Sequence, residues 1–301
     1  MSCNEDGHVS GSLSGGCIEE DLLEKMINGG LAQTKPEIML YGKTADESER
    51  FGLPCGGQLE IIVEPLINNH SLPAFKTIIS RLNERQCIER KVDIATGEIT
   101  IKERNNFKHL QFIGDFANTS IANKNFFVQT YGPRCQLLLI GAGQVSHYLA
   151  QMAQMMDYHV MVCDPREEMI EQWGVEGTQL VNEMPDDAIR NHASDYFTAI
   201  IALTHDPRID DMGLMEALKT DSFFIGAMGS VRTSEKRRDR LLQLNLNERQ
   251  ISKLHAPVGL PIGSKTPAEI AVAILAQLTE MRSKNVHTVK NNSLLREAAT
   301  P

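Results

Sequence analysis

The segment LLLIGAGQVS, residues 137–146, has the pattern of a buried strand that runs into a tight glycine turn. Four apolar residues end at Ile140, and Gly141 and Gly143 then allow the backbone to approach a ligand closely. Apolar residues recur at helical spacing over residues 145–156. The pattern predicts a strand, a turn and a helix whose N-terminus can hold a phosphate group.

A second apolar run, residues 160–163, ends at Asp164. This carboxylate follows Gly141 by roughly 20 residues, which is the position that holds a ribose hydroxyl in a Rossmann fold. Arg166 could equally meet a phosphate at this point. Ser146 replaces the usual third glycine, and we expect it to loosen the packing of the helix on the strand. A fold of this kind can also keep its turn and bind no nucleotide.

Two further apolar runs predict parallel strands that end in polar residues. The run 197–204 precedes His205, and the run that begins at Phe223 ends at Gly229 and Ser230. Ligands of open parallel sheets bind at the carboxyl ends of the strands. His205 is either a proton carrier, a phosphate contact, or a loop residue before the helix that Asp206-Pro207 starts. We expect the basic residues 236–240 to form a solvated helix face.

Two cysteines upstream each stand beside a pair of glycines, in the segments GGC at 15–17 and CGG at 55–57. Successive backbone amides around glycine form anion-binding concavities, and a thiolate beside them is a nucleophile or a soft metal ligand. A single cysteine is more often a buried core residue, but paired glycines favour close approach of a ligand. Cys17 also opens a predicted helix, whose dipole lowers a thiol pKa while the neighbouring acidic residues act in the opposite direction.

Composition limits the classes of protein and of partner. The chain has 301 residues, 42% of them hydrophobic, which suits about two domains. A net charge of −9 argues against nucleic acid as a partner. The start lacks a leader pattern and no apolar run is long enough for a membrane span, so we expect a cytoplasmic protein. The six cysteines form no CxxC pair, which favours free thiols over a disulfide framework or a structural zinc site.

The N-terminus shows an incomplete pattern. Glu5-Asp6-Gly7 is a hairpin-turn signal, and residues 8–13 form the expected strand that leaves the turn. Because only five residues precede Asp6, we expect the strand that enters the turn to be missing and this domain to be truncated at its N-terminus.

Six segments resemble, in order, the XdhC/CoxI family of xanthine dehydrogenase accessory factors. They are residues 11–22, 52–65, 141–146, 203–206, 225–230 and 257–271. The resemblance implies an XdhC/CoxI-type α+β domain at 1–70, a connecting α+β region at 71–132 and a Rossmann-like α/β domain with a parallel sheet at 133–283. Because the sequence beyond residue 283 is polar and irregular, we expect a mobile tail at 284–301. The family's opening strand and helix are absent here.

The resemblance also implies a function. Such a protein binds the molybdenum cofactor (molybdopterin), works with a cysteine desulfurase that installs its sulfido ligand, and delivers it to an apo-molybdoenzyme of the xanthine dehydrogenase type. It implies no catalysis by the protein itself, and we expect a homodimer. The expected cofactor-binding residues are Gly15, Gly16, Cys17, Cys55, Gly56, Gly57, Gly141, Gly143, Asp164, His205, Gly229 and Ser230, with Cys55 as a molybdenum ligand.

Two other functions fit parts of the sequence. An NAD(P)-dependent oxidoreductase would bind its cofactor on the loop 141–146 and use His205 as proton carrier. A zinc- or redox-regulated scaffold would use the cysteines instead.

Overall fold

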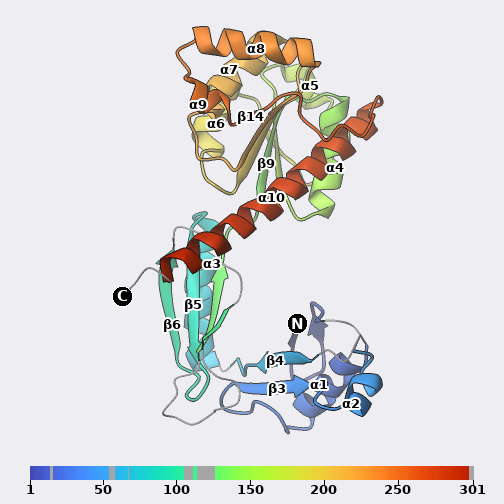
Figure 1. The fold of residues 1–301 in the computed structure, drawn as a ribbon, viewed down its shortest axis with the longest axis vertical. Coiled ribbons are helices and arrows are strands. Elements are labelled where there is room, and N and C mark those ends of the chain that lie inside the picture. The colour runs from blue at the N-terminus through green and yellow to red at the C-terminus, as the bar shows by residue number, and fades with distance from the viewer. Residues whose placement is uncertain (14–15, 54–57, 67, 105–110, 114–125, 298–301) are drawn as a thin grey trace. The chain divides into compact units, whose positions relative to one another are not determined.

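The structure, a computed structural model, describes residues 1–13, 16–53, 58–66, 68–104, 111–113 and 126–297. The chain divides into two compact units, Met1–Gly132 and Pro133–Pro301. Figure 1 shows the helices and strands of both units.

The N-terminal unit combines antiparallel sheets with helices. In chain order its elements are β1 (Ser2–Cys3), β2 (Val9–Ser10), α1 (Cys17–Ile27), β3 (Glu37–Tyr41), α2 (Ala45–Arg50), β4 (Leu59–Val63), α3 (Asn68–Asn83), β5 (Cys87–Asp93), β6 (Ile99–Arg104), β7 (Gln111–Ile113) and β8 (Phe126–Tyr131). Within the described residues β1 pairs with β2, β3 pairs with β4, and four strands form a sheet in the order β6-β5-β8-β7. Helix α1 packs Ile18 and Leu22 with Tyr41 and Ile61 of the β3-β4 pair.

The expectation that no strand enters the first turn is wrong. Ser2 and Cys3 of β1 pair with Ser10 and Val9 of β2. So short a ladder closes because Asn4 holds the turn: its side-chain oxygen accepts from the His8 amide at 2.8 Å, and its carbonyl accepts from the Gly7 amide at 3.0 Å. These bonds substitute for the ladder hydrogen bonds of a longer strand.

The C-terminal unit alternates strands and helices. Its elements are β9 (Gln136–Ile140), α4 (Gln144–Met155), β10 (His159–Cys163), α5 (Glu167–Glu171), β11 (Gln179–Val181), α6 (Pro185–His192), β12 (Thr198–Ala202), α7 (Pro207–Ala217), β13 (Phe224–Ala227), α8 (Val231–Gln243), α9 (Glu248–Ile251), β14 (Leu254–His255) and α10 (Pro267–Glu297). The six strands are parallel, in the order β11-β10-β9-β12-β13-β14. This is the 3-2-1-4-5-6 order of a Rossmann fold, so the predicted fold class is confirmed.

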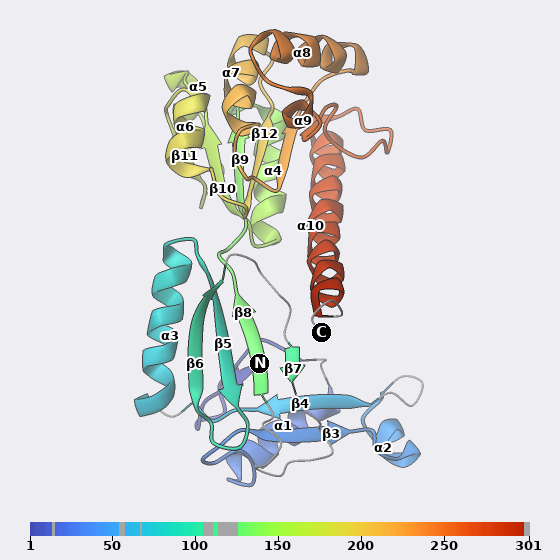
Figure 2. The same ribbon diagram turned by 60° about the vertical axis from the view of Figure 1, so that its left-hand side comes forward.

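Helices cover both faces of this sheet (Figure 2). Strand β9 shows why, because its alternate residues point to opposite faces. Leu137 and Leu139 pack with residues of α4 and α10, whereas Leu138 and Ile140 pack with residues of α6, α7 and α8. All four leucine and isoleucine side chains are fully buried. A strand that is apolar throughout is therefore explained by burial on both faces.

The last helix differs from the expectation. The sequence predicts an irregular tail at 284–301, but α10 continues to Glu297. After Pro267 the helix contains neither glycine nor proline, so no strong helix breaker interrupts it. Among the described residues, no helix combines the length and the apolar character needed to cross a bilayer.

Candidate functional site

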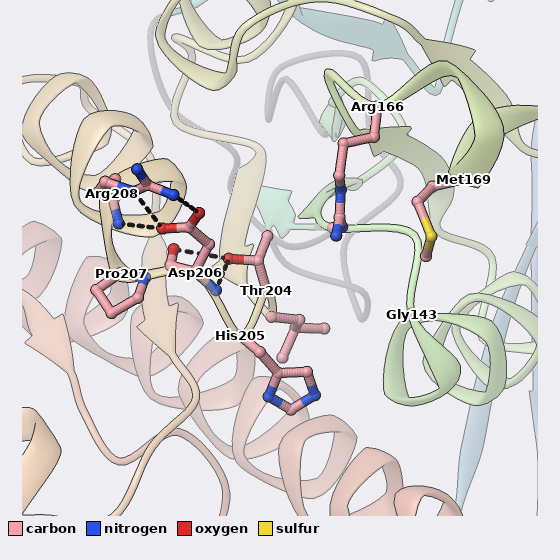
Figure 3. Close-up of a pocket in the computed structure, with 10 residues that line it drawn as sticks. Gly143, Arg166, Met169, Thr204, His205, Asp206, Pro207 and Arg208 are labelled. Atoms are coloured by element: carbon pink, nitrogen blue, oxygen red, sulfur yellow. Dashed lines mark hydrogen bonds and ion pairs between the residues drawn. The ribbon is translucent and has the colours of Figure 1, made fainter.

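A cavity of about 620 Å³ opens at the carboxyl edge of the parallel sheet (Figure 3). It lies where β9 and β12 are neighbours in the sheet. After β9 the chain continues to β10 on one side, and after β12 it continues to β13 on the other. Doubly wound sheets bind ligands at this switch point. Its lining residues are Gly141, Gly143, Arg166, Met169, Leu203, Thr204, His205, Asp206, Pro207 and Arg208.

The two glycines of the first turn have different structural roles. Gly141 has φ +104°, and a Cβ there would lie 2.7 Å from Thr204 Cγ2 and 3.1 Å from the Thr204 amide nitrogen. Any side chain would therefore push the β9 and β12 connections apart. Gly143 precedes α4 as its N-cap, and a Cβ there would meet nothing within 4 Å. The space in front of this helix N-terminus is free for an anion.

Ser146 stabilises the turn, contrary to the expectation that it loosens the packing. The side chain is fully buried, and its hydroxyl donates to the carbonyl oxygen of Gly141. Serine fits here because its hydroxyl bonds to a nearby backbone carbonyl, an interaction that a glycine at this position cannot make.

Asp164 directly follows β10, and its carboxylate is fully buried. Its Oδ2 accepts from the Ala142 amide at 2.9 Å and from Arg166 Nη2 at 2.7 Å, and its Oδ1 accepts from Arg166 Nε at 2.9 Å. Burial acts to raise the pKa of Asp164, but the hydrogen bonds from Arg166 and Ala142 outweigh it and the pKa is lowered. Asp164 thus links the glycine turn to Arg166, and both of its carboxylate oxygens accept hydrogen bonds from these partners.

The opposite wall of the cavity is the connection between β12 and α7. Asp206 caps α7, with its side chain accepting from the Arg208 amide at 2.9 Å. The buried Thr204 hydroxyl accepts from the Asp206 amide at 3.1 Å. His205, between them, is exposed and lines the cavity (Figure 3). The turn is therefore rigid on both sides of an exposed imidazole ring.

A buried ion-pair network lies behind this turn. Arg237 of α8 is 2% exposed, and its Nη2 donates to Asp210 Oδ2 at 2.8 Å while its Nε donates to Asp211 Oδ1 at 3.2 Å. Asp210 Oδ1 in turn accepts from the Thr204 hydroxyl at 2.7 Å. The expectation of a solvated basic face is thus wrong for Arg237. This side chain is buried and pairs with two carboxylates of a different helix, α7.

The structure brings only part of the predicted site together. Gly141, Gly143 and His205 line the cavity, whereas the fully buried Asp164 does not and instead pairs with the lining residue Arg166. Gly229 and Ser230 are exposed at the carboxyl end of β13, where the Ser230 hydroxyl caps α8 by accepting from the Thr233 amide at 3.1 Å. They are not among the lining residues. The predicted residues Gly15, Cys55, Gly56 and Gly57 lie outside the described residues.

In the N-terminal unit, Cys17 is exposed at the first position of α1, directly after Gly16 with φ +82°. Glu19 holds the preceding loop, because its Oε1 accepts from the Ser12 hydroxyl at 2.7 Å and from the Leu13 amide at 2.6 Å. Within the described residues no group of three or more histidine, cysteine or acidic side chains is arranged to hold a metal ion.

Cys163 has the character of a core residue. It is fully buried in β10, and burial together with the neighbouring Asp164 carboxylate raises the pKa of its thiol to about 12. Such a thiol is not a nucleophile near neutral pH.

The sequence patterns did not point to Met169, Thr204 or Arg208 as lining residues. A signal for Arg208 is present, because Asp-Pro-Arg occurs at 206–208 as well as at 164–166, and these segments follow β12 and β10, the two strands that flank β9. Thr204 and Met169 carry no such pattern.

The strand order defines a Rossmann domain, with a cavity at the switch point of its sheet. Residues 137–278 match the family model of the XdhC Rossmann domain, so this part of the chain is an XdhC Rossmann domain. The resemblance to the XdhC/CoxI family seen in the sequence is thereby confirmed.

Curated relatives extend the similarity over both units. The chain is 25% identical over 297 residues to a probable xanthine dehydrogenase subunit of Bacillus subtilis (strain 168), covering 94% of this chain and 88% of the relative. It is 23% identical over 291 residues to the molybdenum cofactor insertion chaperone PaoD of Escherichia coli (strain K12), covering 94% of this chain and 77% of the relative.

A solved structure has the same fold. The crystal structure of a xanthine dehydrogenase from Bacillus halodurans superposes with a TM-score of 0.70 at 22% identity, covering 94% of this chain and 85% of that one.

Proposed function

We propose that this protein is an accessory factor that binds a molybdenum cofactor and inserts it into a molybdoenzyme of the xanthine dehydrogenase type. The observation that carries the proposal is the cavity at the switch point of an XdhC Rossmann domain, with an open helix N-terminus at Gly143 and the cation Arg166 on its wall. Molybdopterin carries a phosphate group, and both features favour a phosphate. PaoD, a relative along most of its length, is named as a molybdenum cofactor insertion chaperone.

The cofactor is cargo in this proposal, so the protein needs to hold and release it without turnover of its own. Gly141, Gly143 and Arg166 would hold the phosphate end. The exposed Cys17, at the start of α1, and Cys55 are the thiols that would contact molybdenum or accept sulfur. Gly15, Gly16, Gly56 and Gly57 would let the backbone approach the cargo, and Gly229 and Ser230 would extend the site along the sheet edge.

The proposal includes three partners of different kinds. The client is an apo-molybdoenzyme, a cysteine desulfurase supplies sulfur for the sulfido ligand, and a second copy of this chain completes a homodimer. Size-exclusion chromatography with light scattering tests the dimer, and co-purification with each tagged partner tests the other two.

One geometric feature disfavours the alternative of an NAD-dependent oxidoreductase. A ribose diol would need a free oxygen of Asp164, but both oxygens accept from Arg166 and one also accepts from Ala142. Binding of a diol would have to break hydrogen bonds between Arg166 and the buried carboxylate of Asp164. His205 also has no neighbour that orients it as a proton carrier among the hydrogen bonds of the described cavity residues.

The decisive experiment is reconstitution. The protein is purified from a host that makes molybdopterin, its molybdenum and pterin content is measured, and it is added in steps to an apo-xanthine dehydrogenase. We expect hydroxylase activity to rise in proportion to the cofactor carried and to saturate near one equivalent of loaded protein. A nicotinamide-dependent oxidation by the protein alone, with no bound pterin, would contradict the proposal and favour the oxidoreductase.

A further inference from the structure

The cavity wall that carries His205 is held from behind by an aspartate of α7. The Thr204 amide donates to Asp210 Oδ1 at 3.2 Å, and the Thr204 hydroxyl donates to the same oxygen at 2.7 Å. The hydroxyl also accepts from the Asp206 amide at 3.1 Å (Figure 3). Residues 204–206, the His205 turn, all line the cavity, whereas Asp210 does not. Asp210 thus acts on the cavity wall without bordering the cavity.

The other oxygen of Asp210 leads to Arg237 of α8. Arg237 Nη2 donates to Asp210 Oδ2 at 2.8 Å. From the same guanidinium group, Nη1 donates to the Met228 carbonyl oxygen at 2.9 Å. Met228 directly follows β13 and begins the Gly229 turn, residues 228–230, which includes the predicted cofactor-binding residues Gly229 and Ser230. One guanidinium group therefore bridges the Gly229 turn and, through Asp210, the His205 turn.

This bridge lies beyond the end of the backbone pairing. The parallel ladder of β12 and β13 ends at the pair Ala202 and Ala227. Within the described residues, the last backbone hydrogen bond between the two connections runs from the Met228 amide to the Ala202 carbonyl oxygen at 2.9 Å. The His205 turn and the rest of the Gly229 turn extend past this bond. Arg237 thus supplies a link where the sheet no longer does.

The bridge is buried and its charges balance. Arg237 is 2% exposed and Asp210 1%. Asp211 accepts from Arg237 Nε at 3.2 Å and from Arg240 Nε at 2.6 Å, so two carboxylates face two guanidinium groups. Because well-packed apolar side chains often stabilise a core as well as buried ion pairs do, stability alone does not require this network. A planar guanidinium with several donors in fixed directions does fix the relative position of the groups that it contacts.

We propose that Arg237 is a positioning residue for the cargo site: it holds the His205 turn and the Gly229 turn in one fixed arrangement without touching the cargo. The inference rests on the proposed function in taking both turns as parts of the site. It adds a residue that lies behind the site and sets its shape.

The first test is amide hydrogen exchange on the full chain without cargo. The hydrogen-bonded amides of Thr204 and Asp206 report on the His205 turn, and the amide of Met228 reports on the Gly229 turn. Arg237→Lys keeps the positive charge, but one ammonium group replaces three donor nitrogens. Relative to the amides of β9, we expect all three reporters to exchange roughly 10- to 100-fold faster, the range for loss of a charge-assisted hydrogen bond.

Asp210→Asn separates the two arms of the bridge. Its Oδ1 accepts from Thr204 and its Oδ2 from Arg237, so an asparagine amide group meets a donor on one side in either orientation. The bond from Arg237 to Met228 is left in place. We expect faster exchange at Thr204 and Asp206 but not at Met228. This variant also carries the test should Arg237→Lys fail to fold.

The second test is binding of the cargo. Wild type and variants are titrated with molybdopterin without oxygen, at a temperature where circular dichroism shows all of them folded. We expect the dissociation constant of Arg237→Lys and of Asp210→Asn to rise roughly 3- to 10-fold, as for loss of about one hydrogen bond to the cargo.

Two controls separate positioning from general stability. Arg240→Gln changes the other arginine of the network, whose hydrogen bond goes to Asp211 and not to either turn. Leu278→Ala opens a cavity among fully buried residues of α10 and α4, on the other face of the sheet. We expect both variants to keep the wild-type affinity for molybdopterin and the wild-type exchange of the three reporter amides relative to β9.

Reporter amides that exchange in Arg237→Lys as in Leu278→Ala would overturn the positioning role, and so would wild-type affinity for molybdopterin in both Arg237→Lys and Asp210→Asn. Faster exchange at Met228 in Asp210→Asn would contradict the two-armed bridge. A wild-type protein that binds no molybdopterin would reject the proposed function, while the exchange test, which contains no cargo, still decides whether Arg237 joins the two turns.

Discussion

Gly141 lies against Thr204 so closely that a Cβ on the glycine would come within 2.7 Å of the threonine methyl group. These residues lie just after the strands β9 and β12, the two neighbours at the switch point of the sheet. Gly141 thus fixes how near the two walls of the cavity come to each other, while Gly143 borders free space. Within one motif, Gly141 therefore serves the stability of the fold, whereas Gly143 leaves room for a ligand.

This contrast predicts different effects of one substitution. Gly141→Ala should destabilise the protein by about 1–3 kcal/mol, because φ +104° is strained for alanine and the methyl group meets Thr204. Gly143→Ala should cost below about 1 kcal/mol, the loss of a good N-cap residue, but should weaken binding of a phosphate probe. Urea unfolding and calorimetry measure the two effects. Equal stability of both variants would contradict the role given to Gly141.

The Asp164–Arg166 pair predicts an acid-sensitive stability. Since the folded pKa of Asp164 is lowered below the unfolded value of about 3.9, its stabilising contribution is complete above that value and is lost as the pH falls through the folded pKa. The melting temperature of the wild type should therefore fall below about pH 4.

Asp164→Asn tests this assignment. The variant should be less stable than the wild type at neutral pH, and its melting temperature should depend less on pH below about pH 4. Asp239→Asn, which removes an exposed carboxylate, is the control for the loss of one charge. A slope in Asp164→Asn as steep as in the wild type would show that other carboxylates cause the acid transition.

The network behind the cavity predicts a large effect of Arg237. Arg237→Met should destabilise the protein by about 3–5 kcal/mol, because Asp210 and Asp211 lose their buried partner and the Met228 carbonyl loses a donor. The neighbouring Lys236 is exposed, so Lys236→Met should change the free energy of unfolding by less than about 0.5 kcal/mol. Urea unfolding compares the two variants. A loss below about 1 kcal/mol for Arg237→Met would mean that the network adds little to stability.

The cysteine assignment predicts loss of cargo without loss of fold. Cys55→Ala should reduce molybdenum retention, with a change in stability below about 1 kcal/mol, because a single thiol contributes little packing. Cys17→Ala should have a smaller effect, since Cys17 is also the first residue of α1. Cys3→Ala controls for the loss of a thiol in the same unit. Metal analysis and thermal melting decide, and unchanged retention in Cys55→Ala would remove this residue from the site.

Replacement of His205 distinguishes a cofactor carrier from an enzyme. The ring is exposed, so His205→Ala should leave stability within about 0.5 kcal/mol and lower cofactor loading at most. Loading is measured by pterin fluorescence after release, and nicotinamide-dependent oxidation is assayed in parallel. An oxidation that wild type performs and His205→Ala does not would assign catalysis to this residue.

Local patterns in the sequence determined the elements of the Rossmann domain. The apolar run 137–140, the glycines after it and the helical spacing beyond them predict β9, the turn and α4, because each pattern depends on residues close together in the chain. The same logic predicts β10, β12 and β13. These local patterns did not predict the two-residue strand β14. Leu254 and His255 pair with β13 at the edge of the sheet, and no local sequence signal marks this pairing.

Tertiary structure alone decided how the polar residues are used. Arg237 has the sequence context of an exposed helix face, but carboxylates 26 and 27 residues earlier bury it. Asp164 has the position of a ribose ligand, but the amide of Ala142, 22 residues away, and the nearby Arg166 occupy its oxygens. A charged side chain is stable in a protein only with suitable partners, and the fold determines which partners come within reach. The sequence thus determined where the cavity forms, and the packing of distant segments determined which of its charges remain free to bind.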